Sequence, residues 1–353
     1  MTGYIFLSFS ISVLLIPIVI MLCKKANWFD TLNERKLHKG KIPRLGSIGF
    51  VPAFAITTFL FYFFNVNTRV IDILPMVIAG LIIFGFGILD DFKDLPARFK
   101  LVVQIIASLV MIGNGFCFTS IGPFQLGWVG YIITFFWFIG IINAFNLIDG
   151  VDALCGGISL LILVALGIIY IMFGTTEEAG LCFILAAAVL GFLIYNKPKA
   201  KIFMGDGGSQ FLGFMIATLS LSPLKQTAHE YNRFLAVTLL VCIPVFDTFA
   251  AIWRRKREHR PFFTPDKMHL HHKLVNMGYT TKVILFFLYT IQIGLCVLAV
   301  CGMWVKGLKG AFILASGFFA MILFFAIIHY TNRAVIRKQT LGLNEDEAKI
   351  LSD

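Results

Sequence analysis

The chain has 353 residues, of which 58% are hydrophobic and 14% are charged, and its mean hydropathy is +0.86. Soluble domains average about 45–50% apolar and about 25% charged residues, so this composition excludes an ordinary soluble protein and indicates an integral membrane protein. The net charge is +11, but the basic residues lie in short loops between apolar segments, which argues against nucleic acid as a partner. The seven Cys include no CxxC pair, which argues against a disulfide framework or a Cys metal site.

Eleven apolar segments follow one another along the chain. A helix needs about 20 residues to cross a bilayer, and no segment shows the alternation of a strand, so each is predicted to be a membrane-spanning helix. The predicted fold class is therefore all-α, with residues 1–330 as a single transmembrane domain and residues 331–353 as a short tail. The predicted spans are 3–23, 46–64, 71–89, 101–118, 128–146, 156–173, 179–195, 209–222, 233–253, 283–304 and 309–330.

The basic residues are unevenly divided between the two sides of this arrangement. With eleven spans, all but five of the 30 Lys and Arg residues fall in loops on one side. Cytoplasmic loops carry such an excess, so we predict that the N-terminus is outside and the tail is cytoplasmic. A basic face attracts anionic lipid and also gathers phosphorylated substrates. The five exceptions are Arg69, Lys225, Arg233, Lys306 and Lys309.

Five carboxylates lie at the cytoplasmic ends of three predicted helices. Asp90 and Asp91 follow the third span, Asp149 and Asp152 follow the fifth, and Asp206 precedes the eighth. The orientation rests on Lys and Arg alone, so the common side of these carboxylates independently supports a single site. Adjacent carboxylates repel each other unless a cation or a shared proton offsets the repulsion, which favours a functional role for Asp90 and Asp91.

Three carboxylates also have structural interpretations. Asp94 is predicted to be a helix cap. Asp206 could cap the helix that follows, but the glycines on both sides of it indicate the close approach of a ligand. Asp247 lies inside the ninth span, where an ionisable residue is either functional or paired. Both interpretations stay open for Asp247, with Arg254 or Arg255 as the partner.

Four polar side chains follow one another at every third position, namely Asn143, Asn146, Asp149 and Asp152. At about 100° per residue, one straight helix cannot direct all four to one point, and Gly150 is predicted to break the helix. The two Asn residues then line the end of the span, and the two Asp residues lie in the loop. Paired Asn and Asp suit sugar hydroxyls, an amide or a hydrated metal.

Basic and imidazole side chains come from several loops. One basic segment, residues 38–46, includes Arg44. The fourth span begins with Lys100 and Gln104. The run 254–257 is typical of the positive-inside signal. Snorkelling is the alternative for Lys100. Three imidazoles before the tenth span are predicted to contact phosphate or to handle protons, because no carboxylate or Cys lies nearby at zinc-ligand spacing and Mg²⁺ prefers oxygen. These are His269, His271 and His272.

Carboxylates, basic loops and imidazoles at one water–lipid boundary indicate phosphoryl transfer to a lipid. Mg²⁺ held by one or two carboxylates neutralises a diphosphate. Lys, Arg and His stabilise a leaving nucleotide, and a second carboxylate can act as a base or nucleophile.

Five motifs, in order along the chain, resemble the polyprenyl-phosphate N-acetylhexosamine-1-phosphate transferase superfamily, which includes the phospho-MurNAc-pentapeptide translocase. The resemblance runs from about residue 30 to residue 273. The eleven spans and the His-x-His-His pattern are more similar to the UDP-GlcNAc-using branch than to the translocase, which has ten spans and three consecutive His. The motifs are RKLH at 35–38 with IPRLG at 42–46, LDD at 89–91 with ARFK at 97–100, NAFNLIDGVD at 143–152, FMGD at 203–206 and HLHH at 269–272.

The resemblance implies transfer of N-acetylhexosamine-1-phosphate from a UDP-sugar to undecaprenyl phosphate, with release of UMP. Within the family it favours GlcNAc-1-phosphate as the transferred group. It implies an active site of cytoplasmic loops at the plasma membrane, Mg²⁺ or Mn²⁺ as cofactor and, by analogy, a homodimer. Asp206 is implied as the metal ligand, Asp90 and Asp91 as the acidic pair that engages or activates the lipid phosphate, and Lys100 as a phosphate contact. The other implied positions are catalytic Asp149 and Asp152 and substrate-binding Arg44, Asn143, Asn146, His269, His271 and His272.

Several changes separate the chain from the usual family pattern. Ser47, Val151, Ala153 and Gly207 stand where the family usually has Gly, Leu, Gly and Ser. The charged groups are intact, but the donor stays open among GlcNAc, GalNAc, QuiNAc, FucNAc and phospho-MurNAc-pentapeptide. The mechanism also stays open between one direct displacement and a phospho-Asp intermediate. The residue of the acidic pair that acts as base is open as well.

A secondary transporter of an anionic solute is the alternative from another class. Many spans, Asp247 inside one of them and breaks at Gly150 and Gly205 are compatible with it. Transporters, however, bind their solutes near the membrane midplane, whereas these carboxylates lie at one face. A non-catalytic scaffold would leave the paired carboxylates unexplained.

Overall fold

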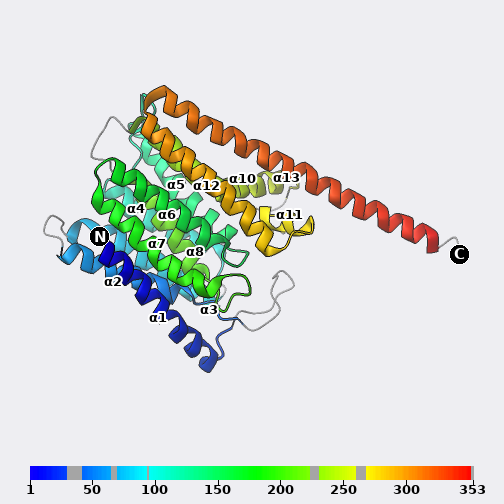
Figure 1. Ribbon diagram of the computed structural model, residues 1–353, viewed down its shortest axis with the longest axis horizontal. Coiled ribbons are helices and arrows are strands. Elements are labelled where there is room, and N and C mark those ends of the chain that lie inside the picture. The colour runs from blue at the N-terminus through cyan, green and yellow to red at the C-terminus, as the bar shows by residue number, and fades with distance from the viewer. Residues whose placement is uncertain (30–41, 65–69, 94, 223–229, 260–267, 351–353) are drawn as a thin grey trace.

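The computed structural model describes residues 1–29, 42–64, 70–93, 95–222, 230–259 and 268–350, with side chains of the last helix described up to residue 337. The helices lie side by side in one bundle, and the C-terminal part of the last helix projects beyond it (Figure 1). In chain order the helices are α1 (Thr2–Ala26), α2 (Ser47–Phe64), α3 (Val70–Lys93), α4 (Ala97–Gly113), α5 (Val129–Ile148), α6 (Leu154–Met172), α7 (Thr176–Asn196), α8 (Asp206–Leu221), α9 (Glu230–Leu240), α10 (Cys242–Arg257), α11 (Leu270–Asn276), α12 (Thr281–Val305) and α13 (Gly307–Ile350).

The prediction of an all-helical, polytopic membrane protein is confirmed. In the described part of the chain, eight helices are long and apolar enough to cross a membrane, or nine if α9 and α10, which are bent by 75° at their junction, form one span. Ten of the eleven predicted spans overlap a single helix, while the ninth, 233–253, is divided between α9 and α10. The fourth prediction extends beyond the end of α4 at Gly113, and α4 and α8 have only 17 and 16 residues, which is short of the about 20 residues of a straight crossing. The only described strands, β1 (Ser120–Ile121) and β2 (Phe124–Gln125), form a two-stranded antiparallel sheet.

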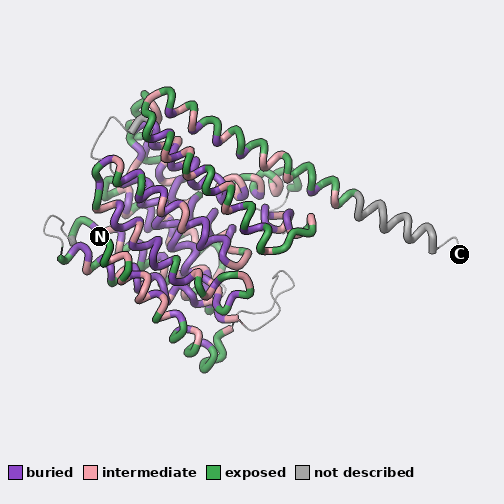
Figure 2. The backbone as a smooth tube through the Cα atoms, in the orientation of Figure 1, coloured by how far each residue is buried: buried purple, intermediate pink, exposed green. Residues whose placement is uncertain are grey.

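Helix α8 lies inside the bundle. Every residue from Gly207 to Leu221 is buried, and the helix packs against α3 and α5. Large apolar side chains such as Leu14, Phe286 and Phe312 are exposed on the outer helices α1, α12 and α13, while buried residues fill the middle (Figure 2). A contiguous apolar exterior of this kind is the surface that lipid covers in a membrane protein.

The C-terminal end of α8 is capped by a buried arginine. Sixteen residues give a helix about 24 Å long, and its last carbonyls have no partner within the helix. Arg233 of α9, 8% exposed, donates from Nε and Nη2 to the Ser220 carbonyl (3.2 and 3.0 Å) and from Nη2 to the Ser222 carbonyl (2.5 Å). The Tyr170 hydroxyl donates to the Leu219 and Ser222 carbonyls.

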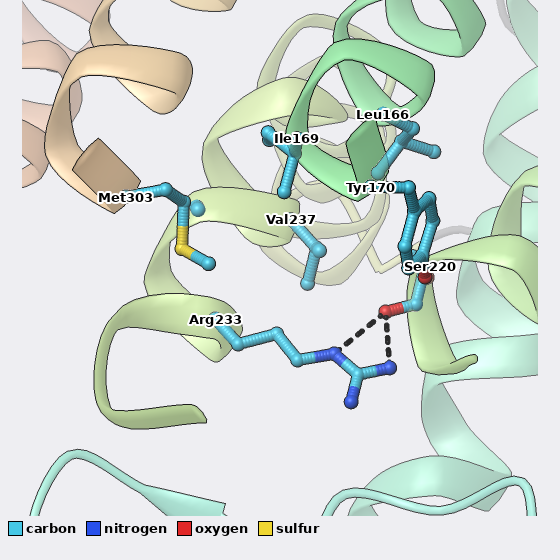
Figure 3. A pocket seen from close by; sticks show the side chains of 8 residues that line it. Leu166, Ile169, Tyr170, Ser220, Arg233, Val237 and Met303 are labelled. Carbon is cyan, nitrogen blue, oxygen red and sulfur yellow. Dashed lines mark hydrogen bonds between the residues drawn. The ribbon is translucent and has the colours of Figure 1, made fainter. Parts of the chain in front are cut away.

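A small, mostly apolar cavity lies beside this cap (Figure 3). Arg233 and Ser220 form one wall, and the guanidinium points toward the end of α8. The charge therefore has carbonyl oxygens as partners, and its surroundings are side chains rather than an open binding surface. The apolar side of the cavity is formed by Leu166, Ile169, Ala236, Val237 and Met303.

Candidate active site

The site is built at the N-terminal end of α8, the opposite end from Arg233. The segment before α2 pairs with the segment before α8, because Phe203 N donates to the Pro43 carbonyl (2.7 Å) and Gly46 N donates to the Phe203 carbonyl (2.8 Å). This pairing brings Arg44 next to Asp206. Residues 35–38 of the first motif and Asp94 lie outside the described residues.

Helices α3 and α8 touch through glycine at the same end. A Cβ added to Gly87 would lie 2.4 Å from the Gly207 Cα, so a larger residue there would separate the two helices. Gly205 has a φ of +78°, which side-chain-bearing residues rarely adopt, and a Cβ there would lie 2.5 Å from Asp91 Oδ2. These glycines let the last turn of α3, which carries Asp90 and Asp91, meet the first turn of α8.

Asp91 holds the start of α8. Its carboxylate accepts hydrogen bonds from Asp206 N (2.8 Å) and Gly207 N (3.2 Å), and the Arg44 Nη2 atom lies 3.2 Å from Asp91 Oδ1. The Asp91 side chain is fully buried. A helix N-terminus leaves its first N–H groups without partners and carries a partial positive charge, so Asp91 supplies the cap that Asp206 was considered for.

Asp206 is thereby left with its carboxylate directed to cations. Lys100 of α4 forms ion pairs with Asp206 Oδ2 (2.6 Å) and with Asp90 Oδ2. Asp90 Oδ1 also accepts a hydrogen bond from Leu95 N (2.7 Å), and Arg44 Nη2 lies 3.9 Å from Asp206 Oδ1. The side chains of Asp206, Lys100 and Arg44 are 22%, 24% and 21% exposed, so a ligand can reach them.

Asp149 is the carboxylate without a partner. It follows the end of α5 at Ile148, which agrees with the predicted helix break, and among the described residues its carboxylate makes no hydrogen bond or ion pair. Desolvation, and then the negative charges of Asp206 and Asp91, raise the pKa of Asp149 to about 8. A carboxyl group with that pKa is available to take a proton or to bind a cation.

The other three polar positions of this segment point to different places. Asn146 Nδ2 donates to the hydroxyl of Ser209 (3.1 Å), one turn into α8. Asn143 Nδ2 donates to Gln104 Oε1 (2.7 Å) inside the bundle, and Asp152 Oδ2 accepts from Ala200 N (3.1 Å). Asn146 and Asp149 therefore lie toward the acidic groups, while Asn143 and Asp152 bind neighbouring helices and loops.

Two site residues were not predicted from the sequence. Ser209 meets Asn146, and Gln210 Oε1 accepts a hydrogen bond from Gln104 Nε2 (3.1 Å). Ser209 follows Asp206 by three positions and Gln210 follows it by four, so a helix places both on the same face as that carboxylate. This spacing was the signal that could have identified them.

The histidine motif covers the Asp149 loop. A Cβ added to Gly150 would lie 2.6 Å from His271 Nε2, so the imidazole rests on the backbone next to Asp149. Burial lowers the pKa of His271 to about 3, so the ring is neutral. The rings of His269 and His271 are nearly parallel, at 8° and 6.0 Å between centroids, and those of His271 and His272 are 4.3 Å apart.

The partner of Asp247 differs from the one predicted. Its carboxylate contacts His269 Nδ1 (3.0 Å) and Leu270 N (2.8 Å) rather than Arg254 or Arg255. The basic side chains at the end of α10 were nearest in sequence, but the start of α11 folds back against the buried face of α10.

The donor set fits a magnesium ion. Among the described residues, no three His, Cys, Asp or Glu side chains are gathered as ligands of one metal, but Mg²⁺ takes one or two carboxylates and completes its shell with water and phosphate oxygens. The four carboxylates at this end, hereafter the acidic cluster, exceed the charge of Arg44 and Lys100 by two when all are ionised. One divalent cation balances that excess. The acidic cluster consists of Asp90, Asp91, Asp149 and Asp206.

Known proteins resemble the chain over most of its length. Residues 73–223 match glycosyl transferase family 4. A probable undecaprenyl-phosphate N-acetylglucosaminyl 1-phosphate transferase of Bacillus subtilis (strain 168) is 34% identical over 323 residues, which is 88% of this chain and 86% of that protein. Undecaprenyl-phosphate alpha-N-acetylglucosaminyl 1-phosphate transferases of Yersinia pestis and Escherichia coli (strain K12) are 33% and 32% identical, over 79% and 73% of this chain and 77% and 72% of their own lengths.

Proposed function

The chain belongs to glycosyl transferase family 4, and on that premise we propose that it transfers N-acetylglucosamine-1-phosphate from UDP-GlcNAc to undecaprenyl phosphate. An oxygen of the lipid phosphate forms a bond to the sugar-bearing phosphorus of the donor. The bond from that phosphorus to the bridging oxygen breaks, and UMP leaves. The products are undecaprenyl-diphospho-GlcNAc and UMP.

One observation carries this proposal. Carboxylates from the end of α3, the end of α5 and the start of α8 lie together with Lys100 and Arg44 at one end of the bundle. Opposite charges in a partly exposed cluster suit a diphosphate diester such as UDP-GlcNAc. Its phosphate oxygens can replace the carboxylates as the partners of Lys100 and Arg44.

Separate roles follow from the contacts of each residue. Asp206 and Asp149, the more accessible members of the acidic cluster, would hold Mg²⁺, or Mn²⁺ in its place, and the ion would neutralise the diphosphate. Lys100 and Arg44 would bind phosphate oxygens, and Asp90 orients the Lys100 ammonium. Asp91 keeps the start of α8 in place. Asn146 and the histidines would contact the sugar nucleotide.

We also propose the arrangement in the membrane. The α9–α10 pair is one bent span, and the short helices α4, which has exposed apolar side chains, and α8, which is buried, each count as a span. Together with the eight long helices they give eleven crossings. The distribution of Lys and Arg supports an outer N-terminus and a cytoplasmic site. The membrane is the plasma membrane, where a polyprenyl phosphate presents its head group at the helix ends.

The test is a defined reaction. The purified protein in lipid nanodiscs receives undecaprenyl phosphate, Mg²⁺ and, in turn, UDP-GlcNAc, UDP-GalNAc, UDP-QuiNAc, UDP-FucNAc and UDP-MurNAc-pentapeptide, and released UMP and the lipid product are measured. We expect UMP and a GlcNAc-bearing lipid only when lipid phosphate and Mg²⁺ are both present. Uptake of an anionic solute into proteoliposomes without UMP formation would overturn the proposal in favour of a transporter.

A further inference from the structure

Asp247 is a buried carboxylate outside the acidic cluster. It lies in α10, it is 2% exposed, and it falls within the ninth predicted span. An ionisable group in such a place is functional or paired with a neighbour. Both of its oxygens are used, since Oδ2 contacts His269 Nδ1 (3.0 Å) and Oδ1 accepts a hydrogen bond from Leu270 N (2.8 Å).

This contact determines which nitrogen of His269 carries the hydrogen. An ionised carboxylate can only accept hydrogen bonds. The Nδ1 atom of His269 must therefore be protonated to bind Asp247, and a neutral ring then has its lone pair on Nε2. His269 is itself 5% exposed, so the ring is held within the structure rather than rotating in solvent.

The oriented ring is linked to the candidate active site through His271. His269 lies parallel to His271, and His271 rests on Gly150, the residue after Asp149. A change in the hydrogen bonding of His269 would thus occur one imidazole ring away from the loop that carries Asp149.

We propose that Asp247 is a positioning residue that holds His269 as the Nδ1–H tautomer, with Nε2 free to accept a hydrogen bond from the bound sugar nucleotide. The role of Nε2 toward the substrate rests on the proposed function, whereas the tautomer does not. Asp247 touches no substrate and acts only through His269.

The Asp247→Asn variant separates this role from a structural one. The amide oxygen of Asn still accepts from Leu270 N, so the start of α11 keeps its anchor. The amide NH₂ then faces His269 Nδ1 and can only donate, which requires an unprotonated Nδ1 and moves the hydrogen to Nε2. An Asp-to-Asn change beside a catalytic histidine inverts the tautomer in serine proteases in the same way.

The first measurement is the tautomer itself. Nitrogen-15 NMR of protein labelled at its seven His residues is compared with the His269→Gln variant, whose missing signals identify His269. We expect Nδ1–H in the wild type and Nε2–H in Asp247→Asn. The same tautomer in both proteins would overturn the proposal, and this result does not depend on any substrate.

The second measurement is a double-mutant cycle on UMP release. We expect Asp247→Asn to lower kcat about 10²-fold because His269 is misplaced, with little change in the KM for lipid phosphate and no further effect in the His269→Gln background. Asp247→Glu should restore part of kcat. An equal loss of kcat in both backgrounds would overturn the proposal. A wild type that releases no UMP would refute the proposed function, while the NMR result would still decide the tautomer.

Discussion

The two ends of α8 differ in what their charged side chains contact: backbone carbonyls at the C-terminal end and other charged side chains at the N-terminal end. At the C-terminal end, Arg233 is buried and donates to the last backbone carbonyls of the helix, beside an apolar cavity. At the N-terminal end, Asp206 faces Lys100 and Arg44 in a partly exposed cluster. That cluster also contains Asp149, whose carboxylate has no hydrogen-bond partner in the described part of the chain. The helix dipole favours both arrangements, because it stabilises carboxylates at the N-terminus and a guanidinium at the C-terminus.

This difference shows how a structural charge can be told from a chemical one in a membrane protein. A buried charge that donates its hydrogen bonds to the carbonyls of a helix end stabilises the fold. Charges that pair with one another in a partly exposed cluster, beside one further carboxylate, can exchange these partners for an ionic ligand. The comparison assigns stability to Arg233 and chemistry to the acidic cluster, and the following variants test that division.

Asp206→Ala should have the largest effect on turnover. Loss of this carboxylate removes the predicted metal ligand and leaves Lys100 with a single carboxylate, so we expect kcat to fall by at least about 10³-fold while the melting temperature changes little. UMP release and thermal unfolding in detergent are measured on the same sample. Asp72→Asn, an exposed carboxylate at the other end of α3, is the matched control and should keep full activity.

Asp149→Asn should have the next largest effect. The amide keeps the shape of the side chain but can no longer bind a cation strongly or take up a proton, so we expect kcat to fall about 10²-fold. Steady-state kinetics at saturating UDP-GlcNAc measure it. Full activity in this variant would mean that the only unpartnered carboxylate of the cluster has no part in the reaction.

Arg233→Met should act on stability alone. It removes both donors from the buried Ser220 carbonyl and leaves the Ser222 carbonyl with Tyr170 alone, and a buried carbonyl without a donor costs roughly 1–3 kcal/mol. We expect unfolding to become about 2 kcal/mol easier, with kcat per folded molecule unchanged. Arg337→Met, an exposed arginine on α13, should change neither. A loss of kcat without a loss of stability would break the division between the two ends.

Gly150→Ala should have the smallest effect of the four. The new Cβ would press on the His271 ring at 2.6 Å, and a shift of α11 should raise the KM for UDP-GlcNAc about tenfold, which corresponds to about 1.4 kcal/mol. Gly140→Ala in α5 is the control, since a Cβ there meets no atom within 4 Å. An equal KM in both variants would separate the histidine motif from donor binding.

The sequence predicted the elements of the site better than their contacts. Apolar runs located the long helices, because burial in lipid requires them, but not the short α11 or the bend between α9 and α10. The predicted helix ends placed Asp90, Asp149 and Asp206 on one side. Rotation of each helix about its axis depends on packing between distant segments. For that reason the inward turn of Asn143 and the pairing of Asp247 with His269, 22 positions apart, could not be predicted.

The central claim is that the acidic cluster binds one divalent cation together with the donor. Electron paramagnetic resonance of Mn²⁺, titrated into nanodisc-embedded protein with UDP-GlcNAc, measures this without turnover. We predict one equivalent of bound Mn²⁺ beyond that held by the nucleotide alone in the wild type and in Asp72→Asn, and none in Asp206→Ala. Unchanged Mn²⁺ binding in Asp206→Ala would contradict the account.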